Sequence, residues 1–266
     1  MELSGTRIIV GLGNPGRQYA ETRHNVGFMA LEALVGEDPY AFGRPSAFKS
    51  SQIATGTLEG ARVILAWPQT FMNLSGVAVR ELAGFYKISV ADGLLVVHDE
   101  MDLPPGKVKA TLGGGSAGHK GIESIREFVR GNFARLRIGI GRPPKEDRDE
   151  AVNVDWVLSR FAESELEAVE SSLKAAGELI RVWLKGGIEA AQRVGNRKPP
   201  KPRKAKEAKE VKEAKDADEG NEAKEAKGGD EAWDAGGREA VPKSEGFPIV
   251  AEDAPKGKGG QKGEGG

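Results

Sequence analysis

The sequence contains no cysteine among its 266 residues, and this absence removes several classes of protein at once. A chain without cysteine has no disulfide framework, no zinc ribbon and no thiol nucleophile. Its histidines number only three and lack the H-x-x-x-H spacing that is typical of a zinc helix. We therefore expect neither a disulfide nor a bound metal.

Long apolar runs are missing as well. No stretch of the sequence approaches the roughly 20 apolar residues that a membrane-spanning helix needs. The first seven residues, MELSGTR, lack the basic and then apolar layout of a signal peptide. These observations predict a soluble, cytoplasmic protein that has no membrane partner.

An excess of charge of one sign is also absent, because 39 basic residues face 40 acidic ones. From residue 197 onward the chain is nearly all Lys, Glu, Ala, Gly, Asp and Pro, with 16 basic and 16 acidic residues. Residues 1–196 therefore carry 23 basic and 24 acidic residues. Such a composition buries too little apolar surface to fold. We expect one globular domain over residues 1–196 and a charged, disordered tail over residues 197–266. Contact of this tail with a protein or RNA is the open alternative.

The apolar periodicity of residues 1–196 predicts strands mixed with helices. Buried strands are expected at residues 7–12, 94–97, 107–112 and 136–140, and a hairpin at residues 52–58 and 62–67. Helices are expected at residues 24–35, 74–86, 122–129, 163–184 and 188–193. The pattern predicts a single α/β domain with a mixed, largely parallel central sheet that is flanked by helices.

Three polar islands interrupt the apolar first half of this domain. They read GLGNPG at residues 11–16, TRHN at residues 22–25 and HDE at residues 98–100. Each island follows or flanks an apolar run, where a strand or helix is expected to end. Together they offer the imidazole of His24, the carboxylate of Asp99 and the amides of Asn14 and Asn25. A base, a group that orients it and a polarising donor are what ester hydrolysis by water requires.

The surroundings of His24 and Asp99 indicate how each is used. Thr22 is a plausible N-cap, which would place His24 in the first helical turn, where the positive end of the helix dipole keeps the ring neutral. A surface histidine near a helix start is an equally good interpretation of the same spacing. Asp99 ends the most apolar strand, a place where polar residues are mostly functional. His98 points to the opposite face of that strand and is expected to be structural.

Two glycine-rich segments allow nucleotide-binding alternatives, and both are weak. The pattern Gly11-x-Gly13-x-x-Gly16 matches a dinucleotide fingerprint, but Pro15 stands where the helix should begin. An oxidoreductase thus remains a minor alternative to a turn that aims Asn14 at the end of the sheet. Residues 113–121, GGGSAGHKG, have His119 where a phosphate loop has its lysine, and no hydroxyl residue follows it. The backbone N–H groups of this segment could still hold a phosphate or a carbonyl oxygen.

A local basic segment stands out in the otherwise neutral domain. Residues 103–145 carry nine basic side chains against the two acidic ones of Glu123 and Glu127. Because this segment adjoins the glycine-rich residues, two interpretations are equally good: it contacts a phosphate backbone, or it is simply a solvated surface.

The FMNLSG segment at residues 71–76 begins a helix, so Asn73 is either a capping residue or a residue of the substrate crevice.

Taken in order, these motifs resemble the bacterial peptidyl-tRNA hydrolase family. The matching segments are VGLGNPG at residues 10–16, TRHN at 22–25, TFMNLSG at 70–76, HDEMDLPPG at 98–106 and LRIGIG at 136–141. The resemblance runs from about Arg7 to Asn196 and excludes the tail. It implies a catalytic domain that cleaves the ester between a stalled peptide and the 3′ ribose of tRNA, as a monomer, with no metal or cofactor and with peptidyl-tRNA as its partner.

The resemblance also implies roles for individual residues. His24 is similar to the base that activates water, Asp99 to the carboxylate that orients it, and Asn14 to an amide that holds the substrate carbonyl. Residues expected to bind substrate are Tyr19, Phe71, Met72, Asn73, Gly118 and Lys120. Residues expected to bind tRNA phosphate are Lys109 and Arg137.

The chain departs from the family pattern at two positions. Many members carry Asn where this chain has Lys120, and a phosphate-clamping Lys where it has Thr111, with Lys109 as the substitute. An RNA-binding relative of the same fold without catalysis is the other interpretation that the resemblance leaves open.

Overall fold

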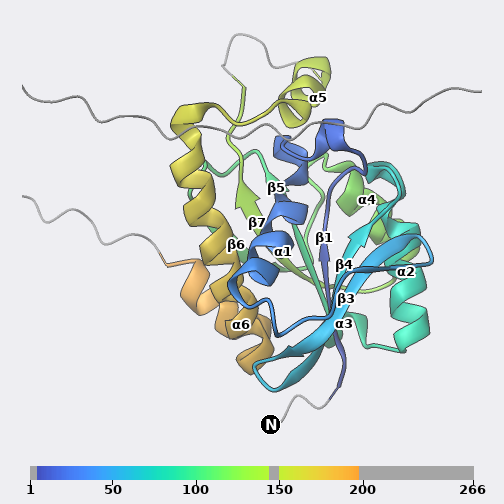
Figure 1. Ribbon diagram of the computed structural model, residues 1–266. Coiled ribbons are helices and arrows are strands. Elements are labelled where there is room, and N and C mark those ends of the chain that lie inside the picture. The colour runs from blue at the N-terminus through green and yellow to red at the C-terminus, as the bar shows by residue number, and fades with distance from the viewer. Residues whose placement is uncertain (1–4, 144–149, 198–266) are drawn as a thin grey trace, which may run out of the picture. The chain divides into compact units, whose positions relative to one another are not determined.

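The computed structural model describes residues 5–143 and 150–197, and its centre is one seven-stranded sheet (Figure 1). The strand order is β2-β3-β4-β1-β5-β7-β6. The strands are β1 (Arg7–Gly11), β2 (Ser46–Phe48), β3 (Ser51–Leu58), β4 (Ala61–Pro68), β5 (Leu94–Glu100), β6 (Val108–Leu112) and β7 (Ala134–Gly139). The four central strands run parallel, and β2, β3 and β6 pair antiparallel at the two sides. The predicted mixed α/β sheet is confirmed.

Helices cover both faces of the sheet. The α-helices are α1 (Val26–Glu37), α2 (Ser75–Tyr86), α3 (Val90–Gly93), α4 (Lys120–Phe128), α5 (Glu150–Leu158) and α6 (Leu166–Gly195). Single 3-10 turns are η1 (Arg17–Tyr19), η2 (Arg23–Asn25), η3 (Met72–Leu74) and η4 (Glu163–Glu165). One apolar core lies between the sheet and helices α1 and α6, and a second lies between the sheet and helices α2 and α4 (Figure 1). Two buried faces explain the continuous apolar runs Ile8–Val10 of β1 and Leu94–Val97 of β5.

Sequence periodicity located most of these elements and missed three. The short edge strand β2, the four-residue α3 and the helix α5 were not expected. The helices predicted at residues 163–184 and 188–193 form one element, α6, and the break between them is a kink at Gly187, where φ is 69°. A positive φ suits glycine and interrupts the helix at that point.

Close packing of α1 against the sheet accounts for the glycines of the first polar island. A Cβ atom at Gly11 would collide with the carbonyl oxygen of Gly27 in α1. At Gly13 it would lie 2.7 Å from the ring of Phe28. The absence of side chains at Gly11 and Gly13 lets the start of α1 lie on the carboxyl ends of β1 and β5. Tight packing thus accounts for two glycines of the pattern that resembled a dinucleotide fingerprint, and the third, Gly16, has a φ of 108°.

The end of α6 closes the described domain. Asn196 accepts a hydrogen bond from the backbone N–H of Ala110 at 3.0 Å and donates one to its carbonyl at 2.9 Å, so the helix end is tied to edge strand β6. The expectation of a disordered tail after this point concerns residues that lie outside those described.

Among the described helices, none combines the length and the apolar character that a membrane crossing requires.

Candidate active site

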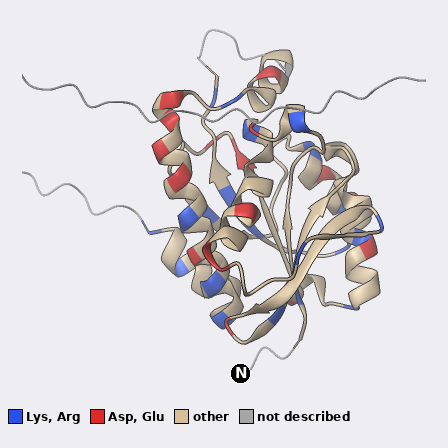
Figure 2. Ribbon diagram, in the orientation of Figure 1, with Lys and Arg blue, Asp and Glu red and all other residues tan. Residues whose placement is uncertain are grey.

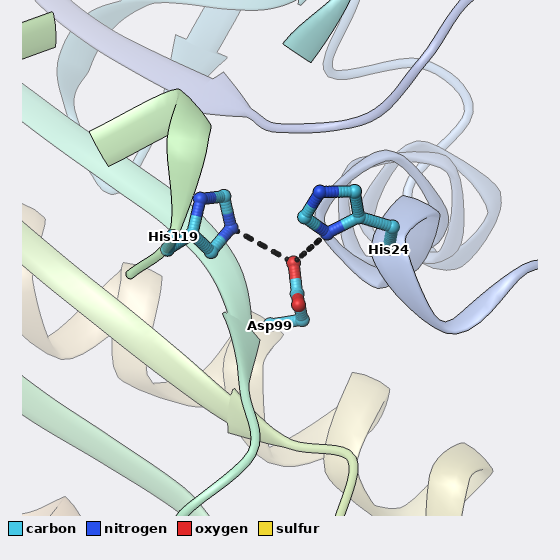
Figure 3. A group of neighbouring side chains, drawn as sticks. All are labelled: His24, Asp99 and His119. Carbon is cyan, nitrogen blue, oxygen red and sulfur yellow. Dashed lines mark hydrogen bonds and ion pairs between the residues drawn. The ribbon is translucent and has the colours of Figure 1, made fainter. Parts of the chain in front are cut away.

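His24 and Asp99 are hydrogen bonded at the carboxyl end of β5 (Figure 3). The Nδ1 atom of His24 lies 2.9 Å from Oδ1 of Asp99, and both side chains are buried. His24 belongs to η2, one turn before α1, and Asp99 is the sixth residue of β5. The predicted meeting of the second and third polar islands is therefore present in the structure.

A third side chain, His119, joins this pair and was not predicted from the sequence. Its Nε2 atom lies 2.9 Å from the same oxygen of Asp99, and its ring centroid is 4.9 Å from that of His24 (Figure 3). The Nδ1 atom of His119 accepts hydrogen bonds from the backbone N–H groups of Gly121 and Ile122, at 3.1 and 3.4 Å. A neutral ring that accepts at Nδ1 carries its proton on Nε2, so His119 donates to Asp99.

The electrostatics of the trio favour an ionised carboxylate beside a basic imidazole. Burial opposes ionisation of Asp99, yet His24 and His119 hold the pKa of this carboxyl well below its ordinary value. Burial likewise lowers the pKa of His24, but the charge and hydrogen bond of Asp99 outweigh it and the net pKa is raised. With Nδ1 directed at Asp99, the His24 ring keeps Nε2 for a proton from water.

Two expectations about the start of this segment are wrong. The Thr22 side chain makes no capping bond, because its hydroxyl donates to the carbonyl of Tyr19 at 2.8 Å. His24 lies in η2, before the first turn of α1, and its net pKa is raised, because the charge and hydrogen bond of Asp99 outweigh the effect of burial. His98, in contrast, is buried, with its Nδ1 atom 2.7 Å from the carbonyl oxygen of Asp99 and its ring edge-on to His119.

The same three side chains are also a possible metal cluster, since their ligand atoms lie within 4.8 Å of one another. A metal ion on Nε2 of His119 would have to move the ring proton to Nδ1. That atom faces two backbone N–H donors. The hydrogen bonds of His119 thus fit a proton-linked trio better than a metal site.

Asn14 is held rigidly at the end of β1. Its backbone N–H donates to Oδ1 of Asn25 at 2.9 Å, and its carbonyl accepts from Nδ2 of Asn25 at 3.0 Å. Its own Oδ1 accepts from the backbone N–H of Met72 at 2.8 Å. Because its oxygen is engaged in this way, the Asn14 amide keeps its N–H₂ group as a donor.

These groups face a cavity of about 600 Å³. Its lining includes Asn14, His24, Phe71, Met72, Asn73, Asp99, Gly118, His119 and Lys120. The structure thus brings together all three residues predicted to be catalytic and five of the six predicted to bind substrate. A second cavity, of about 400 Å³, shares Asn14 with the first.

The remaining predicted residues lie outside this cavity. Tyr19 is half-buried in η1 and lines neither cavity, so its role in substrate binding stays a prediction. Arg137 of β7 binds Glu100, which lines the cavity, with its Nη2 atom 2.7 Å from the carboxylate. Lys109 of β6 is exposed and pairs in register with Arg137.

The basic residues of β6 and β7 are part of a domain in which both charges are dispersed (Figure 2). One of them, Arg135, shapes the glycine-rich segment: its guanidinium donates to the carbonyls of Gly113 and Gly115. Gly113, Gly114 and Gly118 have positive φ, which suits this tightly turned backbone. The backbone N–H groups of Gly121 and Ile122 in α4 donate to His119, so the expectation that the N–H groups of residues 113–121 could hold a substrate oxygen is wrong for Gly121.

Arg23 fixes the segment that carries His24, and no sequence signal indicated this role. Its guanidinium makes a bidentate ion pair with Glu165, at 2.9 and 2.6 Å, and donates to the carbonyl of Ile140 at 3.2 Å. It also lies 3.8 Å from the ring centroid of Trp156 in α5 and 4.8 Å from that of Phe161. Arg23 is 3% exposed, so η2 is anchored from the interior.

Comparison with known proteins adds an independent line of evidence. Residues 8–204 match the model of the family described as peptidyl-tRNA hydrolase. A peptidyl-tRNA hydrolase of Syntrophomonas wolfei is 41% identical over 191 residues, which cover 71% of this chain and all of that protein. One of Bartonella henselae is 41% identical over 67% of this chain and 89% of its own length. The crystal structure of peptidyl-tRNA hydrolase from Acinetobacter baumannii superposes with a TM-score of 0.67 and 33% identity over 75% of this chain and all of that one.

Proposed function

Since this chain belongs to the peptidyl-tRNA hydrolase family, it is a hydrolase of peptidyl-tRNA, and we propose that His24 is the base of the reaction. The observation that carries this proposal is the 2.9 Å hydrogen bond from Nδ1 of His24 to an ionised Asp99 inside the cavity. It orients the ring and leaves Nε2 to take a proton from water.

The proposed reaction is a direct attack of water on the ester carbonyl. As Nε2 of His24 takes one proton, the water oxygen bonds to the carbonyl carbon, and Asp99 stabilises the imidazolium that forms. The Asn14 N–H₂ group supports the negative charge on the carbonyl oxygen, for which one good donor contributes about 3–4 kcal/mol. The ester bond then breaks, and His24 returns the proton to the 3′ oxygen of tRNA. The products are a peptide with a free carboxylate and a tRNA with a free hydroxyl.

His119 supports this arrangement as a positioning residue. It holds Oδ1 of Asp99 from the side opposite His24 (Figure 3), through a ring whose tautomer is fixed by backbone donors. Phe71, Met72 and Asn73 supply the wall for the substrate, together with Gly118 and Lys120 of the glycine-rich segment. The reaction proposed for these residues uses no metal and no cofactor.

The test of this function is the release of an N-acylated amino acid from tRNA by the purified chain. We expect N-acetylaminoacyl-tRNA to be cleaved, and tRNA binding without cleavage would contradict the proposal. We also propose that residues 1–196 form the whole catalytic domain and act as a monomer in the cytoplasm. Turnover by a chain that ends at Asn196 tests whether residues 1–196 form the whole catalytic domain, and sedimentation of that chain tests whether it is a monomer.

We assign contact with tRNA phosphate to Arg137 and Lys109. Arg137 is held at the cavity edge by Glu100, and Lys109 lies beside it on the neighbouring strand. Each phosphate contact adds to the dependence of binding on salt. Arg137→Ala is expected to raise KM for peptidyl-tRNA at near-physiological salt, to flatten the slope of log KM against log salt, and to leave kcat nearly unchanged. The control is Arg62→Ala, an exposed arginine of β4, and equal slopes in both variants would contradict the assignment.

A further inference from the structure

One wall of the catalytic cavity comes from α5, and it contains an amide whose oxygen has no hydrogen-bond partner. Asn153, Val154, Val157 and Leu158 of this helix line the cavity. Within the described residues, Oδ1 of Asn153 is buried and accepts no hydrogen bond. Buried polar atoms are nearly always paired, so an unpaired one beside a catalytic centre points to a partner that arrives with the substrate.

The other buried side-chain oxygens of this cavity are already engaged. Oδ1 of Asn14 accepts from Met72, and Oδ1 of Asp99 accepts from two histidines. Glu100 accepts from Arg137 at 2.8 Å and from the backbone N–H of Asp102 at 3.1 Å. Of the described side-chain atoms that are buried without a partner, Asn153 Oδ1 alone belongs to a residue that lines this cavity.

The glycine-rich segment offers no amide of its own. The ammonium group of Lys120 lies 3.5 Å from Glu123, and 59% of the Lys120 side chain is exposed. The glycine-rich segment therefore supplies no side-chain amide to the cavity, whereas α5 supplies that of Asn153.

We propose that Asn153 binds the peptide part of the substrate, through its Oδ1 and the N–H of the peptide bond next to the ester. This inference rests on the proposed function, because it requires a peptidyl ester in the cavity. The N–H in question is separated from the ester carbonyl by a single Cα atom. A hydrogen bond at that position fixes the carbonyl relative to His24, and it gives the unpaired oxygen its partner only when substrate is bound.

The first measurement compares activity with stability. Asn153→Ala is expected to lower kcat/KM for N-acetylalanyl-tRNA about tenfold, the value of one well-placed hydrogen bond to a buried group. Asn153→Leu is expected to lose activity equally and to melt at the same temperature as the wild type or higher, because it removes an unsatisfied oxygen. The control is Asp155→Ala, an exposed residue of α5 that lines neither cavity, and we expect it to change neither quantity.

The second measurement uses a substrate that lacks the N–H. Proline has no amide hydrogen in a peptide bond, so Asn153→Ala is expected to change kcat/KM for N-acetylprolyl-tRNA by less than about twofold. Equal losses on the two substrates would overturn the proposal, as would full activity of both Asn153 variants on N-acetylalanyl-tRNA. If the wild-type chain cleaves neither substrate, the proposed function itself fails, which is a different result from either of these.

Discussion

Replacement of His24 by alanine is expected to lower kcat for N-acetylaminoacyl-tRNA by at least about 100-fold, the usual contribution of a general base. Among the described residues that line the cavity, this ring alone combines an ion-pair partner at Nδ1 with an Nε2 atom left for water. The loss should fall mainly on kcat, because the substrate walls remain in place. Single-turnover cleavage of labelled substrate measures it.

The His24→Ala variant is expected to stay folded. Asp99 keeps its second hydrogen bond, from His119 at 2.9 Å, so its charge is not left without a partner. A melting curve and the affinity for tRNA provide the controls, and both should stay close to those of the wild type. Turnover within a few fold of the wild-type value in a folded His24→Ala protein would show that His24 is not the base.

Arg23→Ala is expected to lower the free energy of unfolding by about 3 kcal/mol, the low end of the range for breaking a buried ion pair, because the Glu165 side chain that remains is 22% exposed. The substitution deletes the bidentate contact with Glu165 and the cation–π contact with Trp156. It also frees η2, so activity should fall although Arg23 does not line the cavity. Arg23→Lys should restore little of the stability or the activity, because an ammonium group cannot make the bidentate pair.

The chain offers a matched control for this prediction. Arg160 pairs with Glu21 at 2.9 Å, but both side chains are about 70% exposed. Exposed ion pairs contribute at most about 1 kcal/mol, so Arg160→Ala should change stability little. Urea denaturation of the two variants measures the difference. Equal destabilisation by both substitutions would contradict the prediction, because it would mean that the buried contacts of Arg23 stabilise the fold no more than an exposed ion pair does.

The sequence was most informative where apolar strands end in polar residues. Asp99 and Asn14 were found in this way, because strands that are buried on both faces expose their carboxyl ends at one edge of the sheet. His24 was found as the polar residue that precedes an apolar helix. The central strands were found for the same reason, since a short, wholly apolar run bounded by turn residues is typical of a strand inside a covered sheet.

The parts that were missed depend on contacts between distant segments. His119 follows a glycine-rich stretch and begins a helix, and only the fold brings it to Asp99, 20 residues earlier. Its one sequence signal was that it is one of only three histidines. The helix α5 shows no clear apolar period in EAVNVDWVL, and the role of Arg23 depends on Glu165, 142 residues later. Local patterns carry no information about such pairs.

The dependence of kcat/KM on pH, compared between the wild type and Asp99→Asn, tests the central claim most directly. The proposed mechanism requires a neutral His24, so the rate should rise as pH increases through the pKa of this ring. In the wild type Asp99 raises that pKa, which places the midpoint above the ordinary value of about 6.5. In Asp99→Asn the effect of burial remains without the charge, so the midpoint should move to lower pH while the maximal rate falls. A midpoint that is the same in both proteins would contradict the proposed mechanism, because it would mean that the titrating group is not a histidine paired with Asp99.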